Sequence, residues 1–454
     1  MNEKPKVSFI VCGVHVAWPD GLGRPWIDER MVEKCRQSLK DAGMEVVEVP
    51  RIVSKRPQSF AAVQKSLEED VDCIIFYAAT WLWASEMTQA SRIANRPIIV
   101  WTPPISQGWA TGGALVLHGA FDEIGVKHKL VYGFPDDEET MRRIISFVKA
   151  AKIIRKLSTA RLGLVGGRSM GVSVGAIDEA QWMEKFGLDV EHIDQYMVFR
   201  EAEQLSEAEV KKKYNELSKT LGEVPPFDQV MNRSIRIYLA MKKLIADYKL
   251  DMVAFKCFPE IGDYYATACL SQSLLNDEGF TSGCVGDLNT TLTAYVLGQF
   301  TGRPVFNPDV QQVKKEDRLV KLVADGSAAP SLAEALTEVK LARRGVFGEG
   351  NADGICLGLV CKPGFVTLTR LFRIRGRYFM HIAQGEAYLP SNLKEAMDEC
   401  GFPNWPHAFV KLRGDPDAFM QNQRSEYISM SYGDVRDELV DLCYLLDIEL
   451  IETK

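Results

Sequence analysis

Short apolar runs alternate with amphipathic segments along the first 160 residues of the chain. The apolar runs have the length and β-branched content of buried strands, and cover Val7–Val14, Glu45–Val49, Asp72–Tyr77 and Arg96–Trp101. Amphipathic helices are predicted between them, over Asp28–Ala42, Ser59–Glu69 and Ala84–Ile93. This βαβα order predicts a largely parallel sheet with helices on both faces.

The pattern repeats once and then changes. A long helix predicted over Asp137–Leu157 leads into a second α/β unit, which opens with the strand Ala160–Val165. From about Ala342, alternating strands joined by Gly/Pro turns indicate antiparallel structure. We therefore predict an α/β fold with two doubly wound parallel-sheet domains, at residues 1–158 and 159–341. A β-rich, antiparallel and barrel-like domain follows at residues 342–454.

Composition narrows the class of protein. The 454 residues are 46% hydrophobic and 25% charged, as in globular proteins, and the net charge of -7 gives no electrostatic reason to bind nucleic acid. The longest apolar runs have strand length and cannot span a bilayer, and the first residues do not resemble a signal peptide. Ten cysteines without a CxxC pair indicate reduced thiols. A cytoplasmic protein is expected, without nucleic-acid or membrane partners.

Carboxylates follow two successive strands of the second unit. Glu260 and Asp263 lie in the loop after the strand Asp251–Cys257, and Asp287 comes at the end of the next strand-like run. Sites in parallel sheets collect at the carboxyl ends of the strands. Two carboxylates there could bind a divalent cation or share acid/base work. Solvated loop carboxylates, with Asp287 as a helix N-cap, are the alternative.

Other candidate site residues are more isolated. Lys256 precedes the acidic loop, Arg24 lies in a glycine-rich strand–helix junction, and His407 lies in an aromatic, Pro-bounded loop. They are candidates for orienting a substrate, although a solvated Arg and a structural His are the alternatives. The glycine-rich turn Gly166–Gly175 could cradle an anion, but it matches neither the dinucleotide nor the P-loop pattern.

Several short motifs occur together and in a fixed order. They are Ser169–Gly171, Cys284–Val310, Asp325–Ala329, Pro363–Arg370, Ala383–Glu386, Asn404–His407 and Ser431–Asp434. In this order the chain resembles the L-fucose isomerase/L-arabinose isomerase superfamily, and particularly its fucose-isomerase-like branch. The resemblance implies an enzyme that interconverts an aldose and a ketose, free or modified, through a metal-stabilised ene-diol. It also implies a homo-oligomer, a trimer or hexamer.

The resemblance also implies a Mn²⁺ site, or a site for another divalent cation, made by a Glu, an Asp or Glu and a His. Glu260 would be the first ligand, or Asp263 of the same loop in its place. Asp287 would be the second. Both would also carry protons between C1 and C2 of the sugar. Asp287→Asn is expected to leave the fold intact and to abolish proton exchange.

The chain departs from the family pattern at two places. Glu426 and Tyr427 stand where the family has an Asn-His pair that supplies the metal-binding His, and Val285 stands where an acidic residue is usual. Glu426 could supply a third oxygen ligand, since hard cations accept carboxylates, and Tyr427 could then contact substrate. His407 could instead reach the metal, or the metal has been lost. The alternatives are a sugar-binding relative without metal, or an epimerase or C–C lyase.

Overall fold

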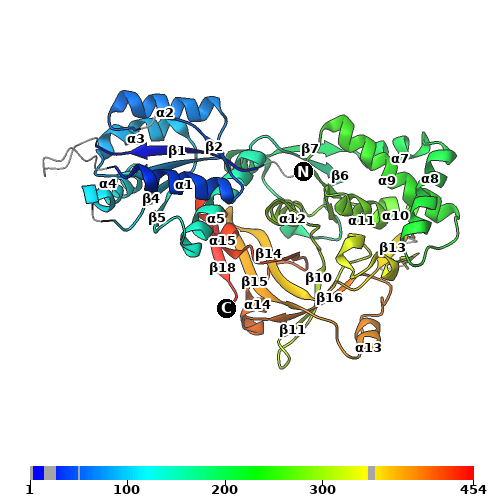
Figure 1. Ribbon diagram of the computed structural model, residues 1–454. Helices are drawn as coiled ribbons and strands as arrows, with labels where there is room; N and C mark the ends of the chain where they lie inside the picture. Colours follow the sequence, from blue (N-terminus) through cyan, green and yellow to red (C-terminus); the bar gives the residue numbers. More distant parts are fainter. Residues whose placement is uncertain (1–3, 15–26, 50–51, 106, 346–352) are drawn as a thin grey trace, which may run out of the picture. The chain divides into compact units, whose positions relative to one another are not determined.

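The computed structural model describes residues 4–14, 27–49, 52–105, 107–345 and 353–454 (Figure 1). The chain forms two compact units. Unit 1 comprises residues 1–156 and 437–446, and unit 2 comprises residues 157–436 and 447–454. The segment 437–446 therefore returns to unit 1 after the chain has built unit 2.

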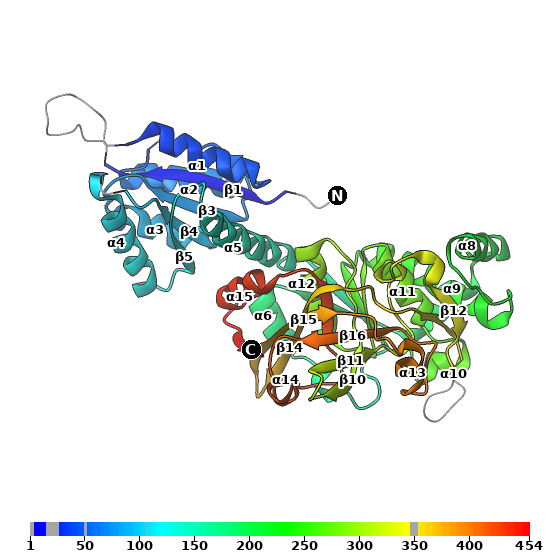
Figure 2. The ribbon, with the colours of Figure 1, turned by 60° about the horizontal axis from the view of Figure 1, so that its bottom comes forward.

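Unit 1 contains a five-stranded parallel sheet in the order β2-β1-β3-β4-β5. Its strands are β1 (Lys6–Cys12), β2 (Glu45–Val47), β3 (Cys73–Ala78), β4 (Ile98–Thr102) and β5 (His128–Tyr132). Its helices are α1 (Glu29–Asp41), α2 (Arg56–Glu68), α3 (Ala84–Ala94), α4 (Ala110–Glu123), α5 (Glu138–Leu157) and α15 (Arg436–Leu445). Helices cover both faces of the sheet, which explains why β3 and β4 are buried along their whole length (Figure 2).

Ion pairs attach α15 to unit 1. Lys129 of β5 lies 2.7 Å from Asp441, whose side chain is 9% exposed, and Lys149 of α5 lies 3.0 Å from Glu438. Asp441 also accepts a hydrogen bond of 2.6 Å from Ser146. These contacts hold a helix from the end of the chain against the first sheet.

Unit 2 contains a four-stranded parallel sheet in the order β7-β6-β8-β9. Its strands are β6 (Arg161–Val165), β7 (Asp189–Ile193), β8 (Met252–Phe255) and β9 (Thr281–Cys284). Its helices are α6 (Glu179–Phe186), α7 (Gln195–Glu203), α8 (Glu207–Thr220), α9 (Gln229–Tyr248), α10 (Glu260–Tyr264), α11 (Cys269–Asp277) and α12 (Leu288–Thr301). The chain passes from β7 across β6 to β8, so the strand order reverses beside β6, where open sheets of this kind bind ligands.

The same unit contains an antiparallel sheet in the order β10-β11-β16-β15-β14-β17, with β18 parallel to β15. Its strands are β10 (Asp309–Lys314), β11 (Leu319–Val323), β14 (Gly364–Ile374), β15 (Arg377–Ala387), β16 (His407–Leu412), β17 (Ser429–Tyr432) and β18 (Glu449–Glu452). The hairpin β12 (Lys340–Arg343) and β13 (Ile355–Gly358) and the helices α13 (Leu393–Asp398) and α14 (Pro416–Asn422) complete the unit. Bridges from Phe306 to Met430 and from Asp309 to Tyr427 bring the first strand to the last.

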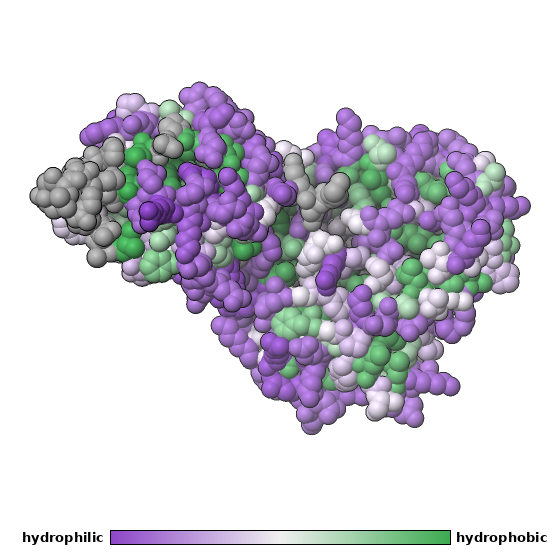
Figure 3. All heavy atoms as spheres, viewed as in Figure 1, coloured by the Kyte–Doolittle hydropathy of each residue, from purple (hydrophilic) through white to green (hydrophobic). Residues whose placement is uncertain are grey.

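The predicted fold class is confirmed: two parallel sheets precede an antiparallel sheet with barrel-like closure. The predicted boundary at residue 341 stays a prediction, and the antiparallel sheet takes β10 and β11 from the segment before it. Hydrophilic residues predominate on the face drawn in Figure 3. No helix within the described ranges has both the length and the apolar character needed to cross a membrane.

Candidate functional site

Loops from the neighbouring strands β6, β8 and β9 meet at the carboxyl edge of the sheet of unit 2. Ser169, in the loop after β6, connects the other two. Its backbone N–H donates to the carbonyl of Val285 at 3.1 Å, and its Oγ donates to the carbonyl of Phe258 at 2.6 Å. Because Glu260 and Asp287 each lie two residues beyond one of these carbonyls, the connection places both carboxylate-bearing loops at one edge.

Glycines allow these loops to approach closely. Gly286 has φ +71°, and a Cβ there would lie 2.0 Å from the carbonyl oxygen of Gly167. A Cβ at Gly175 would lie 2.9 Å from the Cγ of Asp287. Only glycine fits at both positions, since the nearest atoms belong to backbone or to a buried side chain. The glycine-rich turn singled out in the sequence thus covers Asp287.

Asp287 is 1% exposed and makes two kinds of contact. Its Oδ1 accepts a hydrogen bond of 2.9 Å from the N–H of Thr290, so it is the N-cap of α12. Its Oδ2 lies 2.7 Å from Nη2 of Arg370, a residue of β14 that is also 1% exposed. The second terminal nitrogen of the guanidinium, Nη1, donates to the Tyr427 carbonyl at 3.2 Å and to the Thr290 hydroxyl. The predicted cap is present, and a buried cation that the sequence analysis did not assign accompanies it.

Glu260 begins α10 and pairs with Lys256. The Lys256 Nζ donates to Glu260 Oε1 at 2.6 Å, while Glu260 Oε2 is buried and has no hydrogen-bond partner among the described residues. Burial acts to raise the pKa of Glu260, but the hydrogen bonds from Lys256 and the backbone, with the Lys256 charge, outweigh it and lower the pKa. Glu260 is therefore a carboxylate at neutral pH with one oxygen available to a ligand. Asp263, the substitute candidate, is exposed.

Tyr427 lies against the loop that carries Asp287. Its ring packs with Cys284 and Val285, and it is buried. Burial raises the pKa of Tyr427 well above its ordinary value, and the negative charge of Asp309 adds to this. Tyr427, the position at which the resemblance places the metal-binding His, therefore lies against the Asp287 loop and carries a neutral phenol.

Further carboxylates surround Tyr427. Glu426 is partly buried and accepts a hydrogen bond of 2.8 Å from the Ser425 hydroxyl. Burial and the negative charges of Asp325 and Glu426 raise the pKa of Asp309 well above its ordinary value. Asp325 in turn lies 3.4 Å from Arg344, which is 3% exposed. The negative charges of Glu426 and Asp325 thus both act on Asp309. Neither Asp309 nor Asp325 is a candidate site residue in the sequence analysis.

The remaining predicted residues are not brought to this edge by any contact described. Arg24 lies outside the described residues. His407 is fully buried, where its ring contacts the Trp405 carbonyl at 2.7 Å and the Cys400 sulfur at 3.4 Å. Burial lowers the pKa of His407 to about 4. It occupies an interior position of the antiparallel sheet.

The oxygen donors at this edge fit a hard divalent cation in chemistry. The unpartnered oxygen of Glu260 is a ligand that no described residue uses, and carboxylates are what Mn²⁺ or Mg²⁺ prefers. The charge of Asp287 is already balanced by Arg370. Among the described residues, the group of acidic and His side chains that converges most plainly lies in unit 1, at His118, Asp122 and His128. The Mn²⁺ site of Glu260, Asp287 and Glu426 therefore stays a prediction.

The sequence is similar to known isomerases. The sequence model of the L-fucose isomerase C-terminal domain matches residues 324–454. A sulfoquinovose isomerase of Alkalicoccus urumqiensis is 22% identical over 415 residues, which cover 89% of this chain and 91% of that protein. The chain thus resembles the fucose isomerase-like family.

Other relatives extend the similarity over almost the whole chain. A sulfoquinovose isomerase of Priestia aryabhattai is 21% identical over 444 residues, covering 94% of this chain and 97% of the relative. Another from Clostridium sp. is 24% identical over 387 residues, covering 79% and 82%. The family predicted from the ordered motifs is confirmed.

Proposed function

We propose that the protein is an aldose–ketose isomerase that acts on a modified, anionic sugar at the carboxyl edge of the sheet of unit 2. The observation that carries the proposal is the connection through Ser169, which brings the loops of Glu260 and Asp287 together. The relatives named sulfoquinovose isomerases, which this chain matches over most of its length, support the reaction class.

Glu260 is the proposed proton carrier. It is ionised at neutral pH and partly exposed, so it can remove the proton from C2 of the aldose. The electron pair of the broken C–H bond forms the C1–C2 double bond of an ene-diol, while O1 gains a proton. Glu260 exchanges its proton with solvent and delivers a proton to C1, and loss of the O2 proton then gives the ketose. Lys256, 2.6 Å from Glu260, keeps this carboxylate charged and oriented.

The proposed cofactor is a divalent cation such as Mn²⁺. Held by Glu260, Asp287 and Glu426, it would stabilise negative charge that develops on the sugar oxygens. Tyr427 then serves as a neutral hydroxyl beside the site rather than as a replacement for the family's imidazole, since burial keeps its phenol protonated. Arg370 balances the charge of Asp287 and holds this carboxylate in place.

Arg168 is the proposed contact for the anionic end of the sugar. It is exposed on the loop after β6, directly before Ser169, and within the described residues it pairs with no carboxylate. A sulfonate carries a permanent negative charge and oxygens that suit the planar fork of a guanidinium. We also propose, from the resemblance, a cytoplasmic homo-oligomer, a trimer or hexamer.

The test follows hydrogen exchange during turnover. Chelator-treated protein, with and without added Mn²⁺, is incubated in D₂O with sulfoquinovose and in parallel with L-fucose, and NMR detects the products. A ketose with deuterium at C1, formed from sulfoquinovose only with the metal, supports the proposal. Deuterium at C2 of recovered aldose without ketose indicates an epimerase, and shorter fragments indicate a C–C lyase. Binding without turnover that a chelator leaves unchanged indicates a sugar-binding relative.

A further inference from the structure

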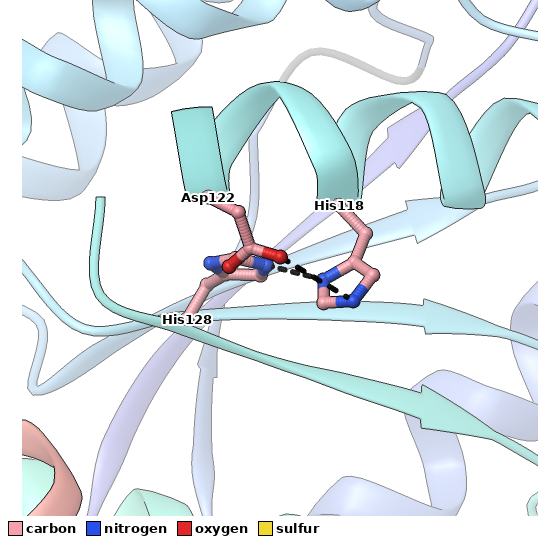
Figure 4. Close-up of side chains that lie close together, drawn as sticks. All are labelled: His118, Asp122 and His128. Carbon is pink, nitrogen blue, oxygen red and sulfur yellow. Dashed lines mark hydrogen bonds and ion pairs between the residues drawn. The ribbon is translucent and has the colours of Figure 1, made fainter. Parts of the chain in front are cut away.

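Two histidines and an aspartate converge in unit 1, on elements that do not contribute to the proposed active site. His118 and Asp122 lie one turn apart on α4, and His128 is the first residue of β5 (Figure 4). The Nδ1 of His118 lies 2.6 Å from the Nε2 of His128, and the Nε2 of His118 lies 3.7 Å from the carboxylate of Asp122. One ligand atom from each side chain falls within 4.8 Å of the other two.

The protonation state of His128 is set by its surroundings. Its Nδ1 lies 2.8 Å from the carbonyl oxygen of Val126, which can only accept, so Nδ1 carries the hydrogen. Its Nε2 therefore presents a lone pair toward His118. His128 is 3% exposed, so its ring is fixed in place by the surrounding residues. A backbone carbonyl that orients one ring nitrogen while the other binds is the usual support of a metal-binding His.

The lone pair on Nε2 of His128 faces Nδ1 of His118. In the metal-free protein, Nδ1 of His118 carries a hydrogen and donates it to this lone pair in an N–H···N hydrogen bond. If instead His118 carries its hydrogen on Nε2, two lone pairs face each other and a cation between them is favoured, with Asp122 in the same cluster as a third ligand. With Zn–N bonds of roughly 2.0–2.1 Å, two tetrahedral nitrogen ligands lie about 3.3 Å apart. His118 is 36% exposed at its side chain and can move outward by the remaining distance.

We propose that His118, Asp122 and His128 form a binding site for a borderline divalent transition metal ion, represented by Zn²⁺, separate from the acidic site of unit 2. Two imidazoles and one carboxylate are a donor set that such ions prefer, and a fourth position remains for water because Asp122 is 62% exposed at its side chain. The ion joins the end of α4 to the start of β5.

Ion binding would also affect the contact between α15 and β5. Tyr444 of α15 donates a hydrogen bond of 2.9 Å to the carbonyl of His128, so the ion would steady the point at which α15 contacts β5. The site does not depend on the proposed isomerase reaction.

The test is a Zn²⁺ titration by calorimetry on tag-free, full-length, chelator-stripped protein, with thermal unfolding recorded with and without Zn²⁺. The compared proteins are wild type, His118→Ala, Asp122→Asn, Glu260→Gln and the control His192→Ala, which removes an exposed His that pairs with Glu179. We expect wild type to bind one equivalent of Zn²⁺ at this site, in addition to any bound at the acidic site of unit 2, and to unfold at a higher temperature. His118→Ala should weaken binding roughly tenfold or more, whereas Glu260→Gln and His192→Ala should not.

The result that overturns the proposal is equal Zn²⁺ affinity in wild type and His118→Ala, or no binding in wild type. His118 is partly exposed, so its substitution should not open the core, and circular dichroism of the variant checks that it is folded. Asp122→Asn provides a second, fully surface variant that changes only the carboxylate ligand.

Discussion

Replacing Asp287 with Asn tests the buried ion pair that joins α12 to β14. Asp287 and Arg370 are each 1% exposed, and their charged atoms lie 2.7 Å apart. Asn keeps the shape of the side chain and its ability to cap the helix through Thr290, because Asn and Asp are about equal at N-caps. The substitution therefore removes one charge and replaces the oxygen that accepts from Arg370 with an amide NH2 group, while the helix cap is kept.

The expected free-energy cost comes from leaving the Arg370 charge buried without its partner. Without Asp287, the guanidinium of Arg370 stays buried, with only a hydroxyl and the Tyr427 carbonyl as acceptors. Breaking a buried pair by removing one partner costs about 3–5 kcal/mol. At about 1.4 kcal/mol per tenfold change, this corresponds to roughly a 10²- to 10⁴-fold increase in local opening.

Hydrogen exchange of α12 amides, followed by mass spectrometry, is the suitable assay, because a two-unit chain has no single free energy of unfolding. Asp178→Asn is the matched control, since Asp178 caps α6 at the surface by accepting a hydrogen bond of 3.0 Å from the Gln181 N–H. It should change exchange of α6 by less than the equivalent of about 0.5 kcal/mol. Unchanged exchange of α12 in Asp287→Asn would refute the reasoning.

A double variant separates charge from packing. Asp287→Asn combined with Arg370→Met removes both charges and should restore part of the lost protection, since an apolar replacement of a buried pair is often tolerated. The structure thus changes the expectation from sequence that Asp287→Asn leaves the fold intact. Loss of activity in that variant can be assigned to chemistry only after its local stability has been measured.

Further predictions concern pH, substrate and catalysis. Burial lowers the pKa of His381 and of His407 from 6.5 to about 4, so the unfolded chain binds more protons between these values. The stability of unit 2, which contains both residues, should therefore fall as the pH drops from about 6.5 to about 4, by about 3 kcal/mol for each His, and the urea midpoint for unfolding of this unit should show a flatter pH profile in the His→Gln variants. Arg168→Ala should raise the KM for sulfoquinovose roughly tenfold, the equivalent of about 1.4 kcal/mol, and leave the KM for a neutral aldose unchanged in steady-state assays. Glu260→Gln should lower kcat by about 10²-fold or more in the same assay, with unchanged circular dichroism.

The parts of the fold that the sequence predicts are those that depend on local pattern. The strands β3 and β8 are continuous apolar runs buried along their whole length, so periodicity and length identify them. The return of α15 to unit 1 depends instead on the pairing of Asp441 with Lys129, which are 312 positions apart. No local pattern encodes a contact at that distance.

The candidate site divides in the same way. Glu260 and Asp287 were predicted because both follow strands that are adjacent in the sheet. Arg370 lies in the motif Pro363–Arg370, but the sequence does not predict its role because its partner Asp287 lies 83 positions away. The signal available was a charged residue in the middle of a strand rich in Leu, Phe and Thr, since such a residue is seldom buried without a partner. That signal identifies a buried ion but not the acid that accompanies it.

The two residues that depart from the pattern of the resembled family pack against each other. The resemblance places an acidic residue at Val285 and the metal-binding His at Tyr427, and both side chains pack in one small cluster with Cys284. Val285 has φ +48°, a left-handed conformation that is costly for a β-branched residue and is retained where surrounding contacts enforce it. If the departures are coupled, Tyr427→His alone places an imidazole against an apolar side chain and gains little Mn²⁺ affinity. Tyr427→His with Val285→Glu should bind Mn²⁺ more tightly than either single variant by calorimetry, and additive effects would show that the two positions changed independently.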